Sequence, residues 1–417
     1  MRNNYIKKTL KNGVKLYLYI DSNMKRTFVD YCVDYGSSGK WFDFYLDEKH
    51  YHVLPGCAHF LEHMLGEHSK YGNIYKYFSD KKYEKNAVTS DIRTHYYFCG
   101  TEDILDSIEK LINIVDDPVF TKEDVEQTKK AIIEETKRSL NNKLRISLAI
   151  YAKNMYKDLD LYHESLSSIG NDETTKKIDY DTLKACYDAF YYDENKTLLI
   201  AGNFDEKELT DYIESIYDKL DSHKKRLKEY EYKYLDDQKT KQEIYYMSTN
   251  DDFVTIGFKQ RFKDFSKKEI NYFLSFMYES KFSIDSKFVE KLKNENIISS
   301  FNGYTYSFIN NEYYDFCIFV NAKNSDKLIQ EMLKEIKENS FNKQDFNLFI
   351  RQIISNHARA IDEKYKEFFN FSYRRRYSDD FDDIDFLKTL TYDRFIEFYD
   401  SLTFDNYTIG IVRNKNS

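Results

Sequence analysis

The alternation of apolar and polar residues predicts strands and helices within the first half of the chain. Residues 14–20 and 28–35 alternate with a period of two, as half-buried strands do, and the second run ends at Gly36. Apolar residues then recur at three- and four-residue spacing over 104–115, which is the period of an amphipathic helix. Asp117-Pro118 ends that helix. The pattern is therefore typical of a mixed α/β chain.

An internal repeat predicts two homologous halves. Two Tyr-Asp pairs followed by an aliphatic run occur near the end of each half, at 180–181, 187–188 and 197–200, and at 392–393, 399–400 and 408–411. A helix feeding a strand therefore closes each half. We predict an α+β fold with two homologous α/β domains, each an antiparallel-rich sheet covered by helices. The expected domains are 1–218 and 243–417, and the charged, aliphatic-poor segment 219–242 is the expected linker.

Length and composition limit the classes of protein. At 417 residues the chain is long enough for two domains. A net charge of −8 argues against nucleic-acid binding, and no apolar run approaches the length of a membrane span. The five cysteines are scattered and odd in number, which indicates reduced thiols and a cytoplasmic location. The 39 tyrosines, with abundant Asn, Lys and Ile, are typical of an AT-rich bacterial genome.

The short motif His59-Phe60-Leu61-Glu62-His63 carries the candidate chemistry. On a helix, positions i and i+4 project from one face, so His59 and His63 can hold one metal ion. Glu62 flanks that face, where it can act on a water bound to the metal. This is the H-x-x-E-H order of the inverzincins. The alternative is a helix that happens to carry two exposed histidines.

A catalytic zinc site needs a third protein ligand and an open position. Residues 121–136 are typical of a helix with acidic residues in its first turn, and two candidate carboxylates, Glu134 and Glu135, lie near its end. Adjacent helical residues point about 100° apart, so only one of the two can face the metal. The pattern alone leaves both candidates open.

With these motifs the chain resembles the pitrilysin/insulinase-type zinc peptidases, in particular the half-length bacterial processing proteases related to mitochondrial processing peptidase. Residues 86–98 resemble the N-A-x-T-S-x-x-x-T-x-Y-Y-F block of that family. Laid on the family's E-K-x-x-V/I-x-x-E-I/M helix without gaps, the ligand falls on Glu135 and an upstream glutamate falls on Thr128. The resemblance therefore implies Glu135 as third ligand, and it departs from the family at Thr128.

The resemblance also implies a substrate site and a partner. In the family, the Asn-Ala-x segment borders an edge strand to which the substrate backbone adds, and this corresponds to Asn86, Ala87 and Val88. Family members place an arginine and a tyrosine in the second domain. Tyr304 or Tyr306 can serve as the tyrosine, but the corresponding stretch, residues 288–306, contains no arginine. We therefore expect half of a clamshell chamber and a second subunit of the same fold, in a homo- or heterodimer.

These inferences predict a zinc metalloendopeptidase that cleaves short unfolded peptides, for example in processing or leader-peptide removal. His59, His63 and Glu135 are the expected ligands of Zn²⁺, and Glu62 is the expected general base. One alternative is a non-catalytic assembly or chaperone-like subunit of a peptidase heterodimer. Another is a metal-binding regulatory or storage protein, which leaves Glu62 and the substrate-strand block without a role.

Overall fold

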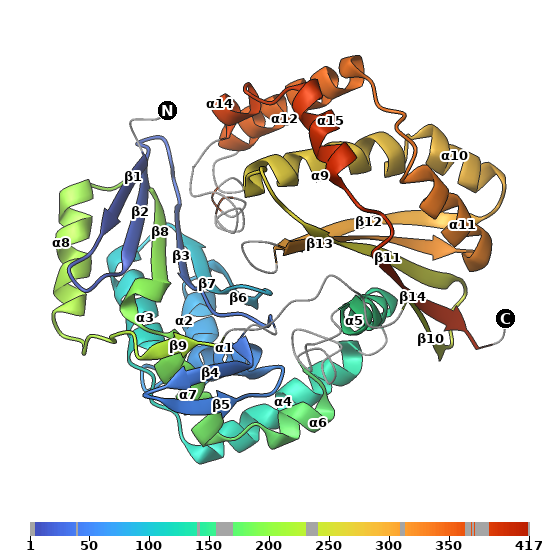
Figure 1. Ribbon diagram of the computed structural model, residues 1–417. Coiled ribbons are helices and arrows are strands. Elements are labelled where there is room, and N and C mark those ends of the chain that lie inside the picture. The colour runs from blue at the N-terminus through green and yellow to red at the C-terminus, as the bar shows by residue number, and fades with distance from the viewer. Residues whose placement is uncertain are drawn as a thin grey trace. The chain divides into compact units, whose positions relative to one another are not determined.

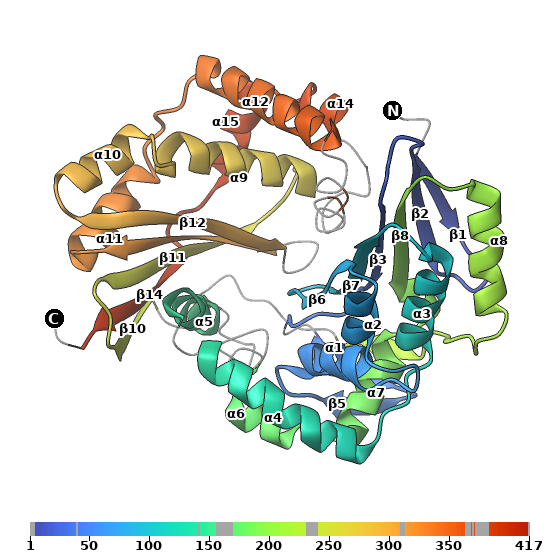
Figure 2. The same cartoon turned by 180° about the vertical axis from the view of Figure 1, so that it is seen from behind.

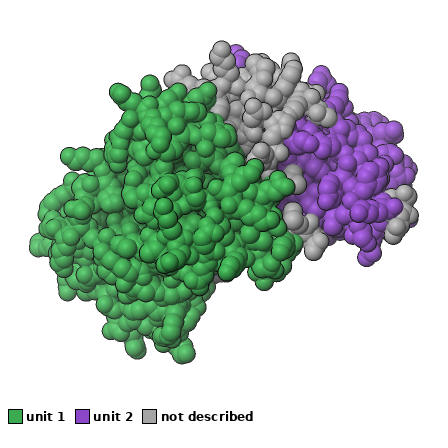
Figure 3. All heavy atoms as spheres, turned by 90° about the horizontal axis from the view of Figure 1, so that it is seen from below, with its two compact units in different colours: residues 1–139, 167–232, 368–372 green, residues 140–166, 233–367, 373–417 purple. Residues whose placement is uncertain are grey.

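A computed structural model describes most of the chain as two compact units. Unit 1 comprises residues 1–139, 167–232 and 368–372, and unit 2 comprises 140–166, 233–367 and 373–417 (Figure 3). The residues that the structure describes are 5–38, 41–139, 142–155, 170–230, 241–308, 313–362, 368, 371 and 383–415. Each unit is built around its own sheet and its own hydrophobic core.

Unit 1 contains a six-stranded sheet in the order β1-β2-β8-β3-β7-β6 (Figure 1). The strands are β1 (Tyr5–Thr9), β2 (Lys15–Ile20), β3 (Thr27–Val33), β6 (Glu84–Thr89), β7 (Thr94–Gly100) and β8 (Lys196–Gly202). All neighbours are antiparallel except β2 and β8. The strands predicted at 14–20 and 28–35 are confirmed as β2 and β3. β6, which carries the expected substrate-binding residues Asn86, Ala87 and Val88, lies at one edge of the sheet.

The helices of unit 1 are α1 (Cys57–Glu67), α2 (Ile74–Asp80), α3 (Ile104–Asp116), α4 (Lys122–Ser139), α6 (Asp172–Lys177), α7 (Tyr180–Phe190) and α8 (Glu206–Tyr217). Helices α1, α2 and α3 pack on the six-stranded sheet, and α4 packs on α1 (Figure 2). The predicted amphipathic helix at 104–115 is confirmed as α3, and its apolar stripe is buried from Ile108 to Val115. A short 3-10 helix (Asp193–Asn195) leads into β8.

The segment predicted as a linker carries a strand. Residues Leu227–Glu229 form β9, which completes a small sheet in the order β5-β4-β9 with β4 (Asp43–Leu46) and β5 (Lys49–His52). Residues 231–240 lie outside the described part. A high charge density therefore did not exclude regular structure within 219–242, because a short edge strand needs little apolar surface.

Unit 2 repeats the strand pattern of unit 1. Its sheet runs β10-β14-β11-β13-β12, with β10 (Gln242–Met247) parallel to β14 (Tyr407–Asn414) and the other neighbours antiparallel. The remaining strands are β11 (Asp252–Arg261), β12 (Ile298–Phe308) and β13 (Tyr313–Ala322). The same relations hold for β2, β8, β3, β7 and β6 in unit 1. As the repeat predicted, a helix leads into a strand near the end of each half: α7 into β8, and α15 into β14. In unit 1, however, α8 follows that strand, so β8 does not end the first half.

Helices cover both faces of the sheet in unit 2 (Figure 1). They are α5 (Lys143–Met155), α9 (Lys267–Phe282), α10 (Lys287–Asn294), α11 (Ser325–Glu335), α12 (Lys343–Asp362), α14 (Ile384–Leu387) and α15 (Tyr392–Ser401). Aromatic side chains of α9, α12 and α15 interlock, with the Phe273 and Phe395 rings 5.8 Å apart. No helix among the described residues is long and apolar enough to cross a membrane.

Helix α5 differs from the predicted domain division. It lies within the expected first domain, 1–218, but it packs on β11 and β14 of unit 2. Ser147 shares a hydrogen bond of 2.7 Å with Thr255. A Cβ on Gly257 would lie 2.0 Å from the Tyr151 ring, so the glycine allows this close approach. Contacts with residues more than a hundred positions away therefore decide where α5 belongs.

A buried ion network fastens the core of unit 1. Lys196, at the start of β8, is fully buried between the carboxylates of Asp116 and Asp193. Asp116 also accepts a 2.5 Å hydrogen bond from Tyr31 on β3. The network joins the end of α3 to the central strands, and its single buried cation compensates two carboxylates.

We predict that Lys196→Met destabilises the protein by about 3–5 kcal/mol, because it leaves two buried carboxylates without their cation. Urea denaturation followed by circular dichroism measures this loss. Lys207→Met is the matched control, since Lys207 pairs with Asp211 on the exposed face of α8 and its loss should leave the unfolding midpoint unchanged. A loss from Lys196→Met no larger than that of the control would contradict the prediction.

Candidate metal centre

Two helices of unit 1 bring His59, His63 and Glu135 together. Both histidines lie on α1, one turn apart, with ring centroids 4.7 Å from each other. Glu135 comes from α4, and its Oε2 lies 3.6 Å from His59 Nε2 and 3.4 Å from His63 Nε2. One ligand atom from each residue falls within 4.8 Å of the others. The structure thus brings together the three ligands expected from the sequence.

The phase of α4 selects Glu135 over Glu134. Val125, Thr128 and Ile132 are buried and mark the inner face of the helix. Glu135 continues this three- and four-residue spacing, so its side chain points toward α1. Glu134 points outward, where Lys137 lies 2.8 Å away and lowers the pKa of its carboxyl group.

These three side chains fit a zinc ion. Two imidazole nitrogens and one carboxylate oxygen form the His₂Glu set found in catalytic zinc sites. Metal–ligand bonds of about 2.0–2.1 Å in a tetrahedron separate the ligand atoms by roughly 3.3 Å. The two Nε2 to Oε2 distances, 3.4 and 3.6 Å, are close to that separation. Little movement is therefore needed to accommodate the ion.

Glu67 is a partner of the site that sequence reasoning missed. Its Oε1 lies 2.8 Å from His63 Nδ1, which leaves His63 Nε2 directed at Glu135. Burial lowers the pKa of His63, but the hydrogen bonds to Glu135 and Glu67 outweigh it and raise that pKa to about 10. A carboxylate on the second ring nitrogen is the usual way to orient a metal-binding histidine. The sequence did contain a signal for this contact, because Glu67 follows His63 by four residues and therefore lies on the same face of the helix.

Glu62 is a buried carboxyl group close to His63 and Glu135. Its side chain is buried and accepts a 2.6 Å hydrogen bond from Thr89 Oγ1 on β6. Burial is the largest influence and raises the pKa of the carboxyl group, whereas the Thr89 bond and nearby His63 lower it. The net shift is upward. A raised pKa is what a carboxylate needs to accept and return a proton near neutral pH.

The expected substrate strand is an edge strand. Among the residues that the structure describes, β6 pairs only with β7, with Val88 opposite His95 and Ala87 opposite Tyr96. Backbone N–H groups of an antiparallel strand alternate between its two sides. The Ser90 N–H donates to Arg93 O across the hairpin, so Val88 and Asn86 also donate toward β7. The Ala87 N–H therefore points to the open edge.

The two tyrosines considered for substrate binding lie on β12 in unit 2. The Tyr304 hydroxyl bonds Ser275 at 2.8 Å, and the Tyr306 hydroxyl donates to Asn271. Both partners belong to α9, and Tyr304 also stacks on Tyr278 at 4.2 Å. Packing between β12 and α9 accounts for both side chains. A role in substrate binding remains a prediction for either one.

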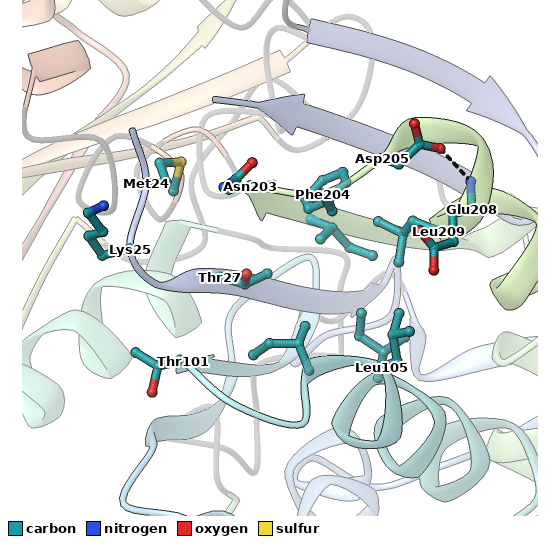
Figure 4. A pocket seen from close by; sticks show the side chains of 13 residues that line it. Met24, Lys25, Thr27, Thr101, Leu105, Asn203, Phe204, Asp205, Glu208 and Leu209 are labelled. Carbon is teal, nitrogen blue, oxygen red and sulfur yellow. Dashed lines mark hydrogen bonds between the residues drawn. The ribbon is translucent and has the colours of Figure 1, made fainter. Parts of the chain in front are cut away.

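A cavity of about 450 Å³ in unit 1 is separate from this centre (Figure 4). It lies between the starts of α3 and α8, where Thr27 begins β3 and Asn203 follows β8. The Glu62 contact is near the other end of β3, since Val33 pairs with Thr94. β3 has 7 residues, so roughly 20 Å of strand separates the two places. The cavity is therefore distinct from the candidate metal centre, none of whose residues line it.

Two family models match the chain in successive segments. Residues 49–162 match the model described as "Insulinase (Peptidase family M16)". Residues 177–353 match the model described as "Peptidase M16 inactive domain". The first match contains His59, Glu62, His63 and Glu135, and the second contains most of unit 2.

A curated relative and solved structures agree with these matches. A Bacillus subtilis (strain 168) protein described as "Uncharacterized zinc protease YmfH" is 31% identical over 205 residues, which is 49% of this chain and 47% of that protein. The matched part thus spans about half of the relative's length. An Alicyclobacillus acidocaldarius protein described as M16-like has 22% identity and a TM-score of 0.87, covering 99% of this chain and 98% of that one. A protease from Helicobacter pylori has 16% identity and a TM-score of 0.80, covering 98% and 99%. At such identities the two structures show the fold alone.

We predict that Glu135→Gln weakens zinc binding by more than the roughly 10–100-fold lost when a partner of a metal ligand is removed. Glu134→Gln removes the same charge from the adjacent position and should leave zinc affinity unchanged. Competition titration with a chromophoric chelator measures both. The assignment is wrong if the Glu134 variant loses zinc and the Glu135 variant keeps it.

Proposed function

The chain belongs to the insulinase family of peptidases, M16, and on this premise we propose that it is a zinc metalloendopeptidase that cleaves short unfolded peptides. The observation that carries the proposal is the convergence of His59, His63 and Glu135 next to a buried Glu62. A protein that merely stores metal has no need for a buried carboxylate at that position.

The chemistry follows from the groups at this centre. A bound Zn²⁺ supplies Lewis acidity, which lowers the pKa of a water molecule and polarises the scissile carbonyl. His59, His63 and Glu135 are the residues that would hold the ion. Glu67 fixes the ring of His63 through Nδ1, so that Nε2 stays available as a ligand.

Glu62 acts as general base and then as general acid. Its Oε2 accepts the Thr89 hydroxyl, and the carboxylate has further lone pairs that can accept the proton of the attacking water. The raised pKa of the carboxyl group allows it to pass the same proton to the leaving amine. Because Glu62 transfers protons, it must not itself become a metal ligand.

The edge position of β6 supports the proposal that substrates bind in an extended form. A peptide that pairs with the Ala87 N–H adds a strand to the sheet and is held through its main chain. A stably folded domain cannot present such a strand without unfolding, at a cost of about 5–15 kcal/mol. Peptides without stable structure avoid that cost. Processing or leader peptides belong to this class.

One alternative function is a non-catalytic assembly or chaperone-like subunit of a peptidase heterodimer. Its support is the match of residues 177–353 to a model described as an inactive domain. That match lies outside the segment that carries His59, Glu62 and His63. A subunit without catalysis has no use for a complete set of ligands and base, so the peptidase is the better supported proposal.

We further propose a second subunit of the same fold, in a homo- or heterodimer, and a cytoplasmic location. The partner would supply the arginine that is missing from residues 288–306. The location rests on the five cysteines, each of which is buried and forms no disulfide. Sedimentation of the purified chain, alone and after co-expression with a neighbouring homologous gene, distinguishes the two kinds of dimer.

We predict that Glu62→Gln retains one zinc per chain and abolishes hydrolysis of a fluorescence-quenched, unstructured peptide. The amide keeps the size of the side chain and removes the proton acceptor. His63→Ala is the contrasting variant, since it should lose both zinc and activity. Turnover by the Gln variant near the rate of the unmodified protein would show that Glu62 is not the base.

We also predict that Ala87→Pro raises the KM for the same peptide by on the order of 10-fold, because it removes one main-chain donor from the open edge. Zinc content should not change. Ala87→Gly is the matched control, as it alters the side chain and keeps the N–H. If the Pro and Gly variants share one KM, strand addition at this position is wrong.

A further inference from the structure

Thr89 connects the edge strand to the candidate general base. It is the last residue of β6, and its hydroxyl donates to Glu62 Oε2 at 2.6 Å. That length is typical of a hydroxyl bonded to an ionised carboxylate. A bond of this kind is about twice as strong as one between neutral groups. Together with the Thr89 backbone, which also hydrogen-bonds the Glu62 carboxyl group, it favours one orientation of that carboxylate.

The hairpin that carries Thr89 is itself firmly held. Directly opposite Thr89, the Thr94 hydroxyl donates to Tyr35 O at 2.9 Å. The Ser37 N–H donates to Ser90 O at 2.9 Å, and the Arg93 guanidinium pairs with Asp34. These contacts tie the turn between β6 and β7 to residues 34–38, which follow β3.

Gly36 is what lets these segments approach so closely. A Cβ at this position would lie 2.5 Å from Ser90 O and 2.6 Å from Arg93 N. Both are backbone atoms, so no side chain can rotate away to make room. Residues 34–38 therefore pack closely against the turn that follows Thr89. Such support is expected where a group has to be held in one orientation.

We propose that Thr89 is a positioning residue for Glu62, and that β6 couples the docking of substrate to the orientation of the base. The inference rests on the proposed function and deepens it. Ala87 and Thr89 project from the same face of β6, toward α1, because side chains alternate along a strand. One strand thus offers its edge to the peptide and, two residues on, its hydroxyl to Glu62. Displacement of the strand would move both together.

The test compares two substitutions at Thr89. Thr89→Val keeps the shape and removes the hydroxyl, whereas Thr89→Ser keeps the hydroxyl and loses a methyl group. We expect Thr89→Val to retain one zinc per chain and an unchanged KM, with kcat on the quenched peptide reduced about 10–100-fold. Thr89→Ser should restore most of kcat. If Thr89 mattered only for folding, Thr89→Val would not lower kcat while leaving KM unchanged. Nor would Thr89→Ser, which keeps the hydroxyl but loses the methyl group, restore kcat.

Thr94→Val is the matched comparison. It removes the hydroxyl opposite Thr89, which donates to Tyr35 O at 2.9 Å and lies 3.4 Å from Thr89 Oγ1. It should lower the melting temperature and affect kcat less than Thr89→Val. Equal losses of kcat in the two variants, or full kcat in Thr89→Val, would overturn the inference.

A crystal structure of Thr89→Val gives a readout that does not depend on activity. The Glu62 carboxylate should rotate or occupy two conformers once the hydroxyl is gone. A single, unchanged Glu62 conformer would contradict the inference even if the protein cleaved no peptide. In contrast, an unmodified protein that binds zinc and cleaves nothing would count against the proposed function. The crystal structure of Thr89→Val would then decide by itself whether Thr89 holds Glu62.

Discussion

The approach of Glu135 to two imidazoles on a neighbouring helix is the constraint on which the rest of unit 1 depends. His59 and His63 share a face because they are one turn apart, but two ligands do not make a catalytic zinc site. The third must come from α4, whose inner face is set by Val125, Thr128 and Ile132. Packing of α4 on α1 therefore determines the ligand geometry. The buried face of α4 therefore serves both to pack the helix and to place the third ligand.

The same unit supplies a second constraint through the turn between β6 and β7. The turn reaches Glu62 through Thr89, and Gly36 permits the close approach that holds it in place. Preorganised groups cost no rearrangement when the reaction takes place, which is why rigid support matters for a base. The ligands come from helices and the orientation of the base comes from a strand. Catalysis in this account requires α1, α4 and β6 to keep their relative positions, all within unit 1.

Much of this arrangement was predictable from sequence, for local reasons. The motif at 59–63 gives its geometry through helical periodicity alone, and strands β2 and β3 follow from alternation. The choice of Glu135 came from a family resemblance, although the buried spacing of 125, 128 and 132 carries the same information. The internal repeat correctly indicated two halves with one topology.

What sequence reasoning missed depends on contacts between distant residues. Thr89 lies 27 positions from Glu62, and Ser147 of α5 lies 108 from Thr255, so neither contact leaves a periodic signal. Glu67 was the exception, since its spacing from His63 was visible. The segment 219–242 was treated as a linker on charge alone, yet pairing with β4 makes β9 a strand. The strand propensity and charge of a segment are local properties, whereas its structure also depends on the strands and helices that it contacts.

The central claim is that His59, His63 and Glu135 hold one zinc ion. Anomalous diffraction from crystals of the zinc-loaded protein, recorded on both sides of the zinc absorption edge, tests it most directly. The account predicts a single strong peak within bonding distance of His59 Nε2, His63 Nε2 and a carboxylate oxygen of Glu135, with Glu62 unligated. A peak bonded to Glu62 or Glu134 in place of Glu135, or no peak at these residues in a protein that carries zinc, would contradict it.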